Sequence, residues 1–464
     1  MLRDRYAPVD LFALVPALEL RFEPELAELD RLLEDDQLFH QFRADLARRR
    51  PHTTETGRPS TPVEAILRLL IIQHLYQWSY AETEHFVGDS LVLRQFCRLG
   101  LEPVPHFTTL LRGANLVQPA TLHRLLDRVT ELARSLQVTR GRKLRLDSTV
   151  VPTAIHYPTD SSLLADGVRV LSRLVRRAGD LLGHGTEPLF RARTRSAKRL
   201  ARAIDATAAA HAPRGASAER PKLYQRLLTI AQASLRQAGR VQSVLDEQAS
   251  AAVERVRAAL VQFRPLVEQA CSQAERRVLQ GEVVPAADKL VSLFEPHSVV
   301  IRRGKAHVPA EFGRKLALDE VDGGLVSHYA ILAGNPPDAA HLAESLLHHQ
   351  SCFEQPPGVL AADRGFSTLD NEQRAQAAGI RTVALPRPGP LRAERRRFEH
   401  RPAFRRAYRW RAGVEGRISL LKRRFGLARC RYRGQAGLER WVGLGILAHN
   451  LRQISHSVAT RRAA

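Results

Sequence analysis

The sequence is poor in cysteine and in long apolar runs, and each shortage excludes a class of protein. Its four cysteines, Cys97, Cys271, Cys352 and Cys430, lie far apart, so their spacing fits neither a disulfide framework nor a cysteine metal site. We therefore expect four buried thiols in a reducing cytoplasm. No apolar run approaches the roughly 20 residues that cross a bilayer, and charges interrupt the N-terminal segment. We expect neither a membrane protein nor a secreted one.

Acidic residues are scarce relative to basic ones. The 464 residues include 71 Lys or Arg and 48 Asp or Glu, a net charge of +23. Residues 391–464 alone hold 20 basic and 4 acidic residues, a local balance of +16. A basic excess of this size favours a polyanionic partner, and its concentration favours nucleic acid over an ordinary solvated face.

Hydrophobic spacing predicts two helical regions. Residues 1–136 carry apolar side chains three or four apart, which is typical of amphipathic helices. Within them, residues 105–136 offer two helices separated by a Gly/Asn/Pro break. These form either a helix-turn-helix that contacts DNA or an ordinary helical hairpin. Residues 165–293 are again helical and predict a large insertion.

Strand signals occur on both sides of this insertion. The segment KLRLDSTVV, residues 143–151, alternates around β-branched residues, and the pair Gly323-Gly324 marks a hairpin. An apolar strand ends at Asp363, and helix, strand and basic helix follow it. An antiparallel meander that merges into a βαβ layer predicts an α/β core, a mixed sheet with flanking helices. The expected parts are a helical N-terminal domain, a core in two pieces, a helical insertion and a basic helical C-terminal tail, at residues 1–136, 137–164 with 294–428, 165–293 and 429–464.

Three carboxylates stand where such a core could hold metal ions. Asp147 lies inside a strand between Leu and Val residues, where an uncompensated charge is costly. Asp363 ends an apolar strand at the edge where ligands collect, although a turn-capping role is an alternative. Glu415 is the one acid in the basic segment of residues 408–424. Phosphoryl transfer by two metal ions needs converging carboxylates, and Mg²⁺ prefers such oxygen ligands.

Helical periodicity places Glu415 on a polar stripe. At about 100° per residue, Tyr408, Arg411, Glu415 and Lys422 fall within about 60° of one another. A surface ion pair between Arg411 and Glu415 is the simpler interpretation, but it leaves the other two residues unexplained. The stripe combines phosphate-binding side chains with one potential metal ligand. Trp410 beside it either stacks on a base or packs against the sheet, and packing is favoured.

The spacing Tyr-x₂-Arg-x₃-Glu-x₆-Lys resembles the signature of bacterial insertion-sequence transposases, DDE enzymes with a ribonuclease H-like core. LDST around Asp147 and AADRGF around Asp363 are similar to the first and second aspartate motifs of that group. Residues 57–96 resemble its helical N-terminal domain. The resemblance implies a DNA transposase that binds terminal inverted repeats and catalyses metal-dependent DNA cleavage and strand transfer.

The resemblance also implies roles for single residues. Asp147, Asp363 and Glu415 would be catalytic and would hold two Mg²⁺ ions, for which Mn²⁺ can substitute. Target DNA, a homodimer on DNA and a cytoplasmic, nucleoid-associated location follow from the same resemblance. No GxxxxGK[ST] loop is present, so no nucleotide cofactor of that kind is expected. The expected DNA contacts are Tyr408, Arg411, Lys422, Arg364 and Arg423.

The chain departs from the usual pattern in its spacing. Asp147 and Asp363 are 216 residues apart, whereas Asp363 and Glu415 are only 52 apart. The short second gap leaves no room for the β-rich insertion that some relatives carry there. The sequence therefore leaves open whether the reaction passes through a DNA hairpin intermediate. A catalytically inactive DNA-binding relative and a stand-alone metal-dependent nuclease are the alternatives. The intact triad argues against the first, and the helical N-terminal domain argues against the second.

Other titratable residues carry no motif. The 18 histidines show no zinc spacing, and packing or surface roles are expected for His74, His85, His328 and His449. Four aspartates rank well below the triad as metal ligands: Asp160, Asp166, Asp319 and Asp322.

Overall fold

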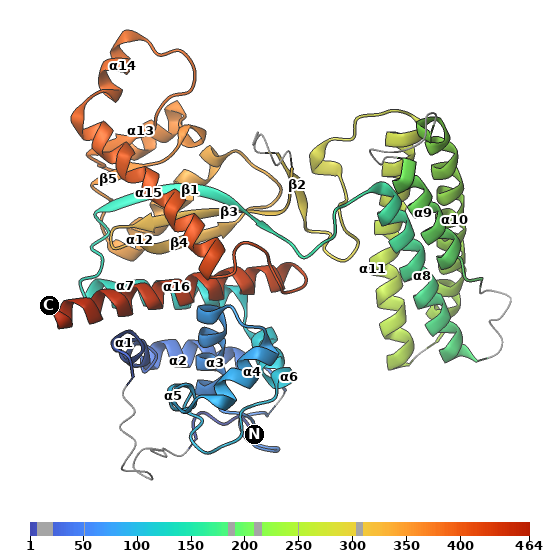
Figure 1. The fold of residues 1–464 in the computed structure, drawn as a ribbon, viewed down its shortest axis with the longest axis horizontal. Coiled ribbons are helices and arrows are strands. Elements are labelled where there is room, and N and C mark those ends of the chain that lie inside the picture. Colours follow the sequence, from blue (N-terminus) through green and yellow to red (C-terminus); the bar gives the residue numbers. More distant parts are fainter. Residues whose placement is uncertain (7–21, 51, 184–190, 208–215, 249, 303–309) are drawn as a thin grey trace. The chain divides into compact units, whose positions relative to one another are not determined.

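The computed structural model describes residues 1–6, 22–50, 52–183, 191–207, 216–248, 250–302 and 310–464. Parts of the predicted helical regions lie outside the described residues, at 7–21, 184–190 and 208–215. The chain divides into two compact units (Figure 1), Met1–Pro152 with Lys315–Ala464, and Thr153–Arg314. Among the described residues, no helix has both the length and the apolar character that a membrane span requires.

The first unit begins with helices α1–α7. They span Pro24–Leu32, Asp36–Ala47, Val63–Tyr76, Tyr80–Asp89, Leu91–Phe96, Phe107–Leu116 and Pro119–Ser135. Helix α3 is apolar on nearly all sides and is buried from Val63 to His74, so α2, α4 and α6 pack around it. Its fully buried Arg68 is compensated by ion pairs with Asp30 and Glu64. The predicted helical N-terminal part is therefore present.

A mixed sheet follows these helices. In the first unit its strands lie in the order β4-β3-β1-β5-β6. Strands β3 and β4 form an antiparallel hairpin, and β5 pairs in parallel with β1 and β6. The hairpin turn uses Gly323 and Gly324 at φ values of 84° and 76°, which only glycine adopts readily. In the second unit, β2 pairs with the first residues of β3. Strands β1–β6 span Lys143–Pro152, Val299–Ile301, Glu311–Val321, Leu325–Ile331, Val359–Ala361 and Thr382–Ala384.

Different helices cover the two faces of this sheet (Figure 1). On β5, Ala361 packs with Phe404 and Ala407 of α15, whereas its neighbour Leu360 belongs to the same core as Phe353 of α12. Because side chains alternate across a strand, α15 and α12 lie on opposite faces. The elements concerned are η4 (Asp338–His341), α12 (Leu342–Phe353), η5 (Arg364–Phe366), α13 (Leu369–Ala377), α14 (Ala393–Glu399) and α15 (Pro402–Arg424).

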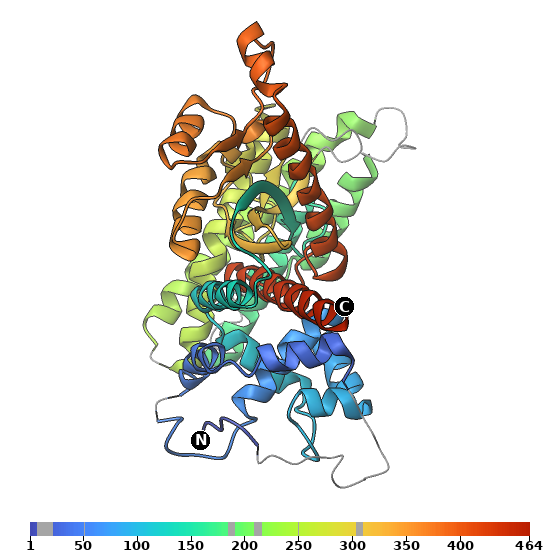
Figure 2. The ribbon, with the colours of Figure 1, turned by 90° about the vertical axis from the view of Figure 1, so that its left-hand side faces the viewer.

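Residues 429–464, for which a basic helical tail is predicted, consist mainly of the C-terminal helix α16, Gln435–Ala463. It lies beside α7 in both Figure 1 and Figure 2, and it also packs against α1 and α3. Trp441, Leu444 and Leu447 are buried on several sides of the helix. The region that composition marks as basic therefore ends in a core helix, because most of its arginines precede α16.

The second unit consists mainly of helices α8–α11. They span Asp160–Leu182, Thr194–Thr207, Ala216–Asp246 and Ala251–Ala274, and two short turns follow at Glu275–Leu279 and Ala286–Asp288. Val168 and Leu171 of α8 pack with Leu260 and Val267 of α11 in a core separate from that of the first unit. The predicted large helical insertion is confirmed as an element of the fold.

Candidate active site

The three carboxylates selected from the sequence lie on three elements of the first unit. Asp147 is in β1, whose alternation places it on the face opposite Leu146. Asp363 follows β5, and its Oδ1 accepts a hydrogen bond from the backbone N–H of Gly365 at 2.9 Å. In the parallel pairing of β1 with β5, Arg145 lies opposite Ala361. Asp147 and Asp363 each follow these residues by two positions, so they lie at equivalent positions on neighbouring segments. Glu415 lies in the middle of α15.

Arg411 of α15 joins all three carboxylates. Its Nη2 lies 2.9 Å from Oδ2 of Asp147 and 3.8 Å from Oδ2 of Asp363. Its Nη1 lies 2.9 Å from Oε1 of Glu415. The side chains of Arg411 and Asp147 are only 12% and 11% exposed, so this pair is largely shielded from water. The Arg411–Glu415 ion pair is present, and it is one part of a site in which Arg411 contacts three carboxylates.

A buried charge cluster that the sequence analysis did not identify holds α15 against β1. Nη2 of Arg145 lies 2.5 Å from Oε1 of Glu320 on β3, and Nε of Arg417 lies 3.2 Å from the same oxygen. The guanidinium of Arg145 also lies 4.7 Å from the ring centroid of Trp410, which packs beside it as the favoured interpretation expected. Arg145 precedes Asp147 by two residues, so strand alternation was the available signal that both face α15.

The triad's ligand atoms suit a hard divalent cation. All three residues supply carboxylate oxygens, the ligands that Mg²⁺ prefers. Their shared neighbour is the guanidinium of Arg411, so positive charge already occupies the point on which they converge. The residues therefore fit a divalent metal once Arg411 turns away from them.

An open cavity of about 560 Å³ adjoins the triad along α15. Tyr408 lines this cavity and lies one helical turn before Arg411. Arg364 also lines it and directly follows Asp363. Two of the five predicted DNA contacts therefore share this cavity. Its one carboxylate, Glu399, already pairs with Arg395 at 2.8 Å. The lining residues are Arg364, Pro386, Glu399, His400, Pro402, Phe404, Arg405, Tyr408 and Arg409.

The remaining two predicted DNA contacts lie at the other end of α15. Lys422 is half-buried and Arg423 is exposed in the last turn of the helix. Lys422 follows Glu415 by seven residues, which is about 10 Å along a helix. The side chain of Gln77, at the end of α3, donates a hydrogen bond to the backbone carbonyl of Arg423. This end of α15 is thus tied to the N-terminal helices and lies away from the triad.

Comparison with known families gives two matches. Residues 16–115 match a transposase domain (DUF772), and residues 311–451 match a transposase DDE domain. The chain belongs to the insertion-sequence DDE transposases. No curated protein and no solved structure matches it. The predicted ribonuclease H-like α/β fold of this transposase is confirmed by the DDE domain together with its mixed sheet.

The matched ranges bear unequally on the triad of the transposase. Asp363 and Glu415 lie within the DDE match, together with Arg411. Asp147 lies outside both matches, because the second unit intervenes between β1 and β3. Asp147 is therefore supported by its sequence motif, by the strand register and by its contact with Arg411, and not by a family match.

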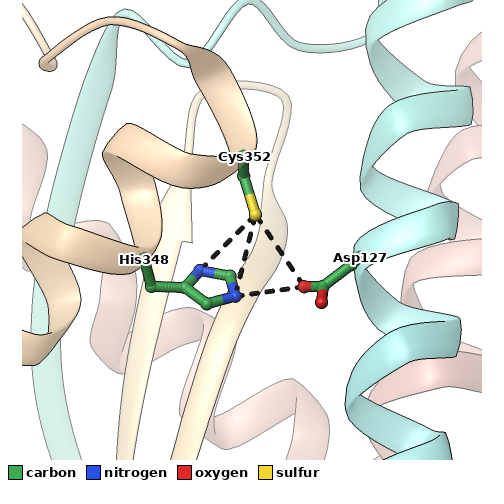
Figure 3. Close-up of side chains that lie close together, drawn as sticks. All are labelled: Asp127, His348 and Cys352. Carbon is green, nitrogen blue, oxygen red and sulfur yellow. Dashed lines mark hydrogen bonds and ion pairs between the residues drawn. The ribbon is translucent and has the colours of Figure 1, made fainter.

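The transposase also brings together titratable residues that no sequence motif linked. Figure 3 shows Asp127 of α7 beside His348 and Cys352 of α12. Nε2 of His348 lies 3.0 Å from Oδ1 of Asp127, and Sγ of Cys352 lies 3.6 Å from Nδ1 of His348. Burial would lower the pKa of His348, but the hydrogen bonds to Asp127 and Cys352 outweigh it and raise that pKa to about 10. Cys352 is half-buried, so the expectation of a buried thiol is wrong there. The four-residue spacing on one helix face was the available signal.

Proposed function

We propose that this transposase binds the terminal inverted repeats of an insertion sequence and catalyses metal-dependent DNA cleavage and strand transfer. Asp147, Asp363 and Glu415 are its catalytic carboxylates in this proposal. The supporting observation is the arrangement around Arg411, where carboxylates from β1, from the end of β5 and from α15 converge on one cation. Convergence of this kind on rigid elements is what metal-assisted phosphoryl transfer requires.

In this proposal the carboxylates hold two Mg²⁺ ions, for which Mn²⁺ can substitute. The bound metal supplies Lewis-acid stabilisation of the phosphate and a nucleophile at neutral pH. Arg411 keeps the carboxylates compensated in the free protein and then turns toward a DNA phosphate, the other strong partner for a guanidinium. One side chain thereby couples the arrival of DNA to the opening of the metal site.

The basic cavity beside the triad gives the DNA strand a path. Arg364 and Tyr408 would contact the backbone next to Asp363, and Arg405 and Arg409 add positive charge to the same cavity. Lys422 and Arg423 would contact DNA about two helical turns further along α15.

The remaining parts of the chain have roles in end recognition. The N-terminal domain, residues 1–136, recognises the repeats, and a homodimer brings two transposon ends together. The sequence-based extents remain a proposal for the core at 137–164 with 294–428, the insertion at 165–293 and the segment at 429–464. The compact second unit of the structure spans Thr153–Arg314. The charge of the protein and its transposase domains support DNA as the partner.

A strand-transfer assay tests the proposal. Purified full-length protein is given Mg²⁺ or Mn²⁺ and labelled DNA carrying the ends of its element, beside the Glu415→Gln and Glu394→Gln variants. Glu394 is an exposed carboxylate of α14 outside the triad and serves as the matched control. We expect end cleavage and joined product from wild type and E394Q, and a loss of both by at least about 1,000-fold in E415Q, with DNA binding retained.

Each other outcome counts against part of the proposal. Binding without cleavage by any of the three proteins identifies a DNA-binding relative. Cleavage without joining identifies a nuclease. Full activity of E415Q removes Glu415 from the catalytic triad.

A further inference from the structure

A second group of metal-ligating side chains lies on the other face of the catalytic sheet. Asp319 of β3 and His328 of β4 are direct cross-strand partners, so their side chains point to the same face. His341, the last residue of η4, approaches them from the side of α12. One ligand atom from each residue lies within 4.8 Å of the ligand atoms of the other two. Sequence spacing gave no hint of this, because the hairpin register and the η4 turn create the cluster.

The group is buried, and several of its polar atoms lack hydrogen bonds. Asp319, His328 and His341 are 1%, 8% and 3% exposed. Among the described residues, neither ring nitrogen of His328 or His341 has a hydrogen-bond partner, and neither does Oδ2 of Asp319. Buried polar groups are almost always satisfied by protein, water or an ion. One such atom from each of the three side chains can face a common point, where a bound ligand would satisfy it.

A buried ion pair is the simplest alternative, and it accounts for part of the cluster. Nε2 of His341 lies 3.5 Å from Oδ1 of Asp319, and the hydroxyl of Ser345 donates to the same oxygen. Within the described part of the chain, that pair leaves Oδ2 of Asp319 and Nδ1 of His328 without a polar partner. A bound cation would engage Asp319 and one ring nitrogen of each histidine at once.

Glu344 supplies a fourth oxygen at the mouth of the cluster. Its Oε1 lies 3.5 Å from Nε2 of His328, and its Oε2 lies 3.4 Å from Nδ1 of His341. Its side chain is 60% exposed, so it can move inward without rearrangement of the core. Two imidazoles and two carboxylates would supply four ligands once Glu344 leaves Nδ1 of His341 for the side of that ring that faces Asp319.

We propose that Asp319, His328 and His341, closed by Glu344, form a structural Zn²⁺ site separate from the catalytic carboxylates. Nitrogen and oxygen ligands in a closed set of four suit tetrahedral Zn²⁺, whereas Mg²⁺ requires oxygen ligands and several waters. The site joins the β3–β4 hairpin to the start of α12. It lies across the sheet from α15, because Glu320, the neighbour of Asp319, faces Arg145 and Arg417.

The metal content of full-length protein tests this site. The protein is purified without added metal and analysed by elemental mass spectrometry. We expect about one zinc per chain, also in an Asp147→Asn, Glu415→Gln background where the catalytic carboxylates are removed. After chelation, returned Zn²⁺ should raise Tm by about 5 °C in that background, and Mg²⁺ should not. This readout needs no change at the site itself, so a folding defect cannot obscure it.

Variants locate the ligands. His341→Ala should weaken zinc binding by at least about 100-fold. His349→Ala removes a buried histidine of α12 outside the cluster and should retain zinc, as should Cys352→Ser in the neighbouring group shown in Figure 3. Zinc absent from wild type, zinc lost with the catalytic carboxylates, or zinc lost in C352S but kept in H341A would each overturn the proposal. These results are independent of whether the strand-transfer assay succeeds.

Discussion

Arg411 has two competing partners at the scale of single residues. In the structure its guanidinium contacts three carboxylates, and in the proposed reaction it contacts DNA phosphate. Carboxylates this close to one another repel unless a cation lies among them. Arg411 therefore stabilises the free protein at the position where a metal would otherwise be needed.

Replacement of this arginine should make stability depend on metal. Arg411→Gln should lower the metal-free free energy of unfolding by about 3 kcal/mol, because the shielded ion pair between Arg411 and Asp147 is lost. Mg²⁺ should restore much of that loss in the variant, and it should raise the free energy of unfolding of wild type by a smaller amount. Urea unfolding with chelator and then with Mg²⁺ measures both values. The matched control is Arg409→Gln on an exposed position of the same helix, which should change stability by no more than about 0.5 kcal/mol. An R411Q protein that responds to Mg²⁺ as wild type does would contradict the competition.

At the scale of elements, the site depends on how closely α15 approaches β1. Gly413 lies where the helix crosses the guanidinium of Arg145, and a Cβ there would collide with that group. Arg145 cannot easily yield, because it is paired with fully buried Glu320. The absence of a side chain at Gly413 therefore sets the distance between Glu415 and Asp147.

Gly413→Ala should push α15 outward. We expect a loss of about 2 kcal/mol in stability from overpacking and a fall of about 100-fold in strand-transfer rate from misplacement of Glu415. Gly416→Ala is the matched control, since no atom lies within 4 Å of the point that a Cβ would occupy there, and helix propensity predicts a gain of up to about 1 kcal/mol. Thermal unfolding and the strand-transfer assay provide the two readouts. Equal behaviour of the two variants would refute the close-approach argument.

At the scale of the whole molecule, the second unit has a core of its own. Leu171 and Val267 belong to a cluster drawn entirely from residues 163–293. A fragment of residues 153–314 should therefore fold alone, with a helical circular dichroism spectrum and a cooperative urea transition. Leu171→Asp in that fragment should abolish the transition, because it places an unpaired charge in the core. A wild-type fragment without cooperative unfolding would show that the core is insufficient.

Two buried histidines should make the stability of the first unit fall in acid. Burial lowers the pKa of His74 to about 4, and burial together with the Arg417 charge lowers the pKa of His449 to about 3. Both pKa values lie below the unfolded value of about 6.5, so the unfolded chain binds protons first as pH falls. Stability present above pH 6.5 is therefore lost toward pH 4, by about 2 kcal/mol per histidine between pH 7 and pH 5.

His449→Gln isolates one of these contributions. Nε2 of His449 accepts a hydrogen bond from Arg417 at 2.8 Å and Nδ1 donates to Asn450 at 3.0 Å, and an uncharged glutamine amide can replace both bonds. Between pH 7 and pH 5, the free energy of unfolding measured by urea titration should fall by about 2 kcal/mol less in the variant than in wild type. An unchanged pH profile would show that His449 does not contribute.

Local features of the chain were sufficient to predict the elements and the family. The alternation around Asp147, the strand that ends at Asp363 and the stripe from Tyr408 to Lys422 each depend on residues close in sequence. The periodicity of apolar and polar residues indicates such elements directly. The α/β fold, the helical insertion and the transposase family were therefore predictable, and the three carboxylates could be proposed as a set.

Contacts between distant segments could not be read in this way. The bridging position of Arg411, the Arg145–Glu320–Arg417 cluster and the group of Asp319, His328 and His341 depend on strand register and helix approach. The burial of α16 likewise depends on packing with α1, α3 and α7, which outweighs the charge of the region before it. A single sequence records which side chains are available, but the free energy of burying and pairing them is defined only when segments hundreds of residues apart come into contact.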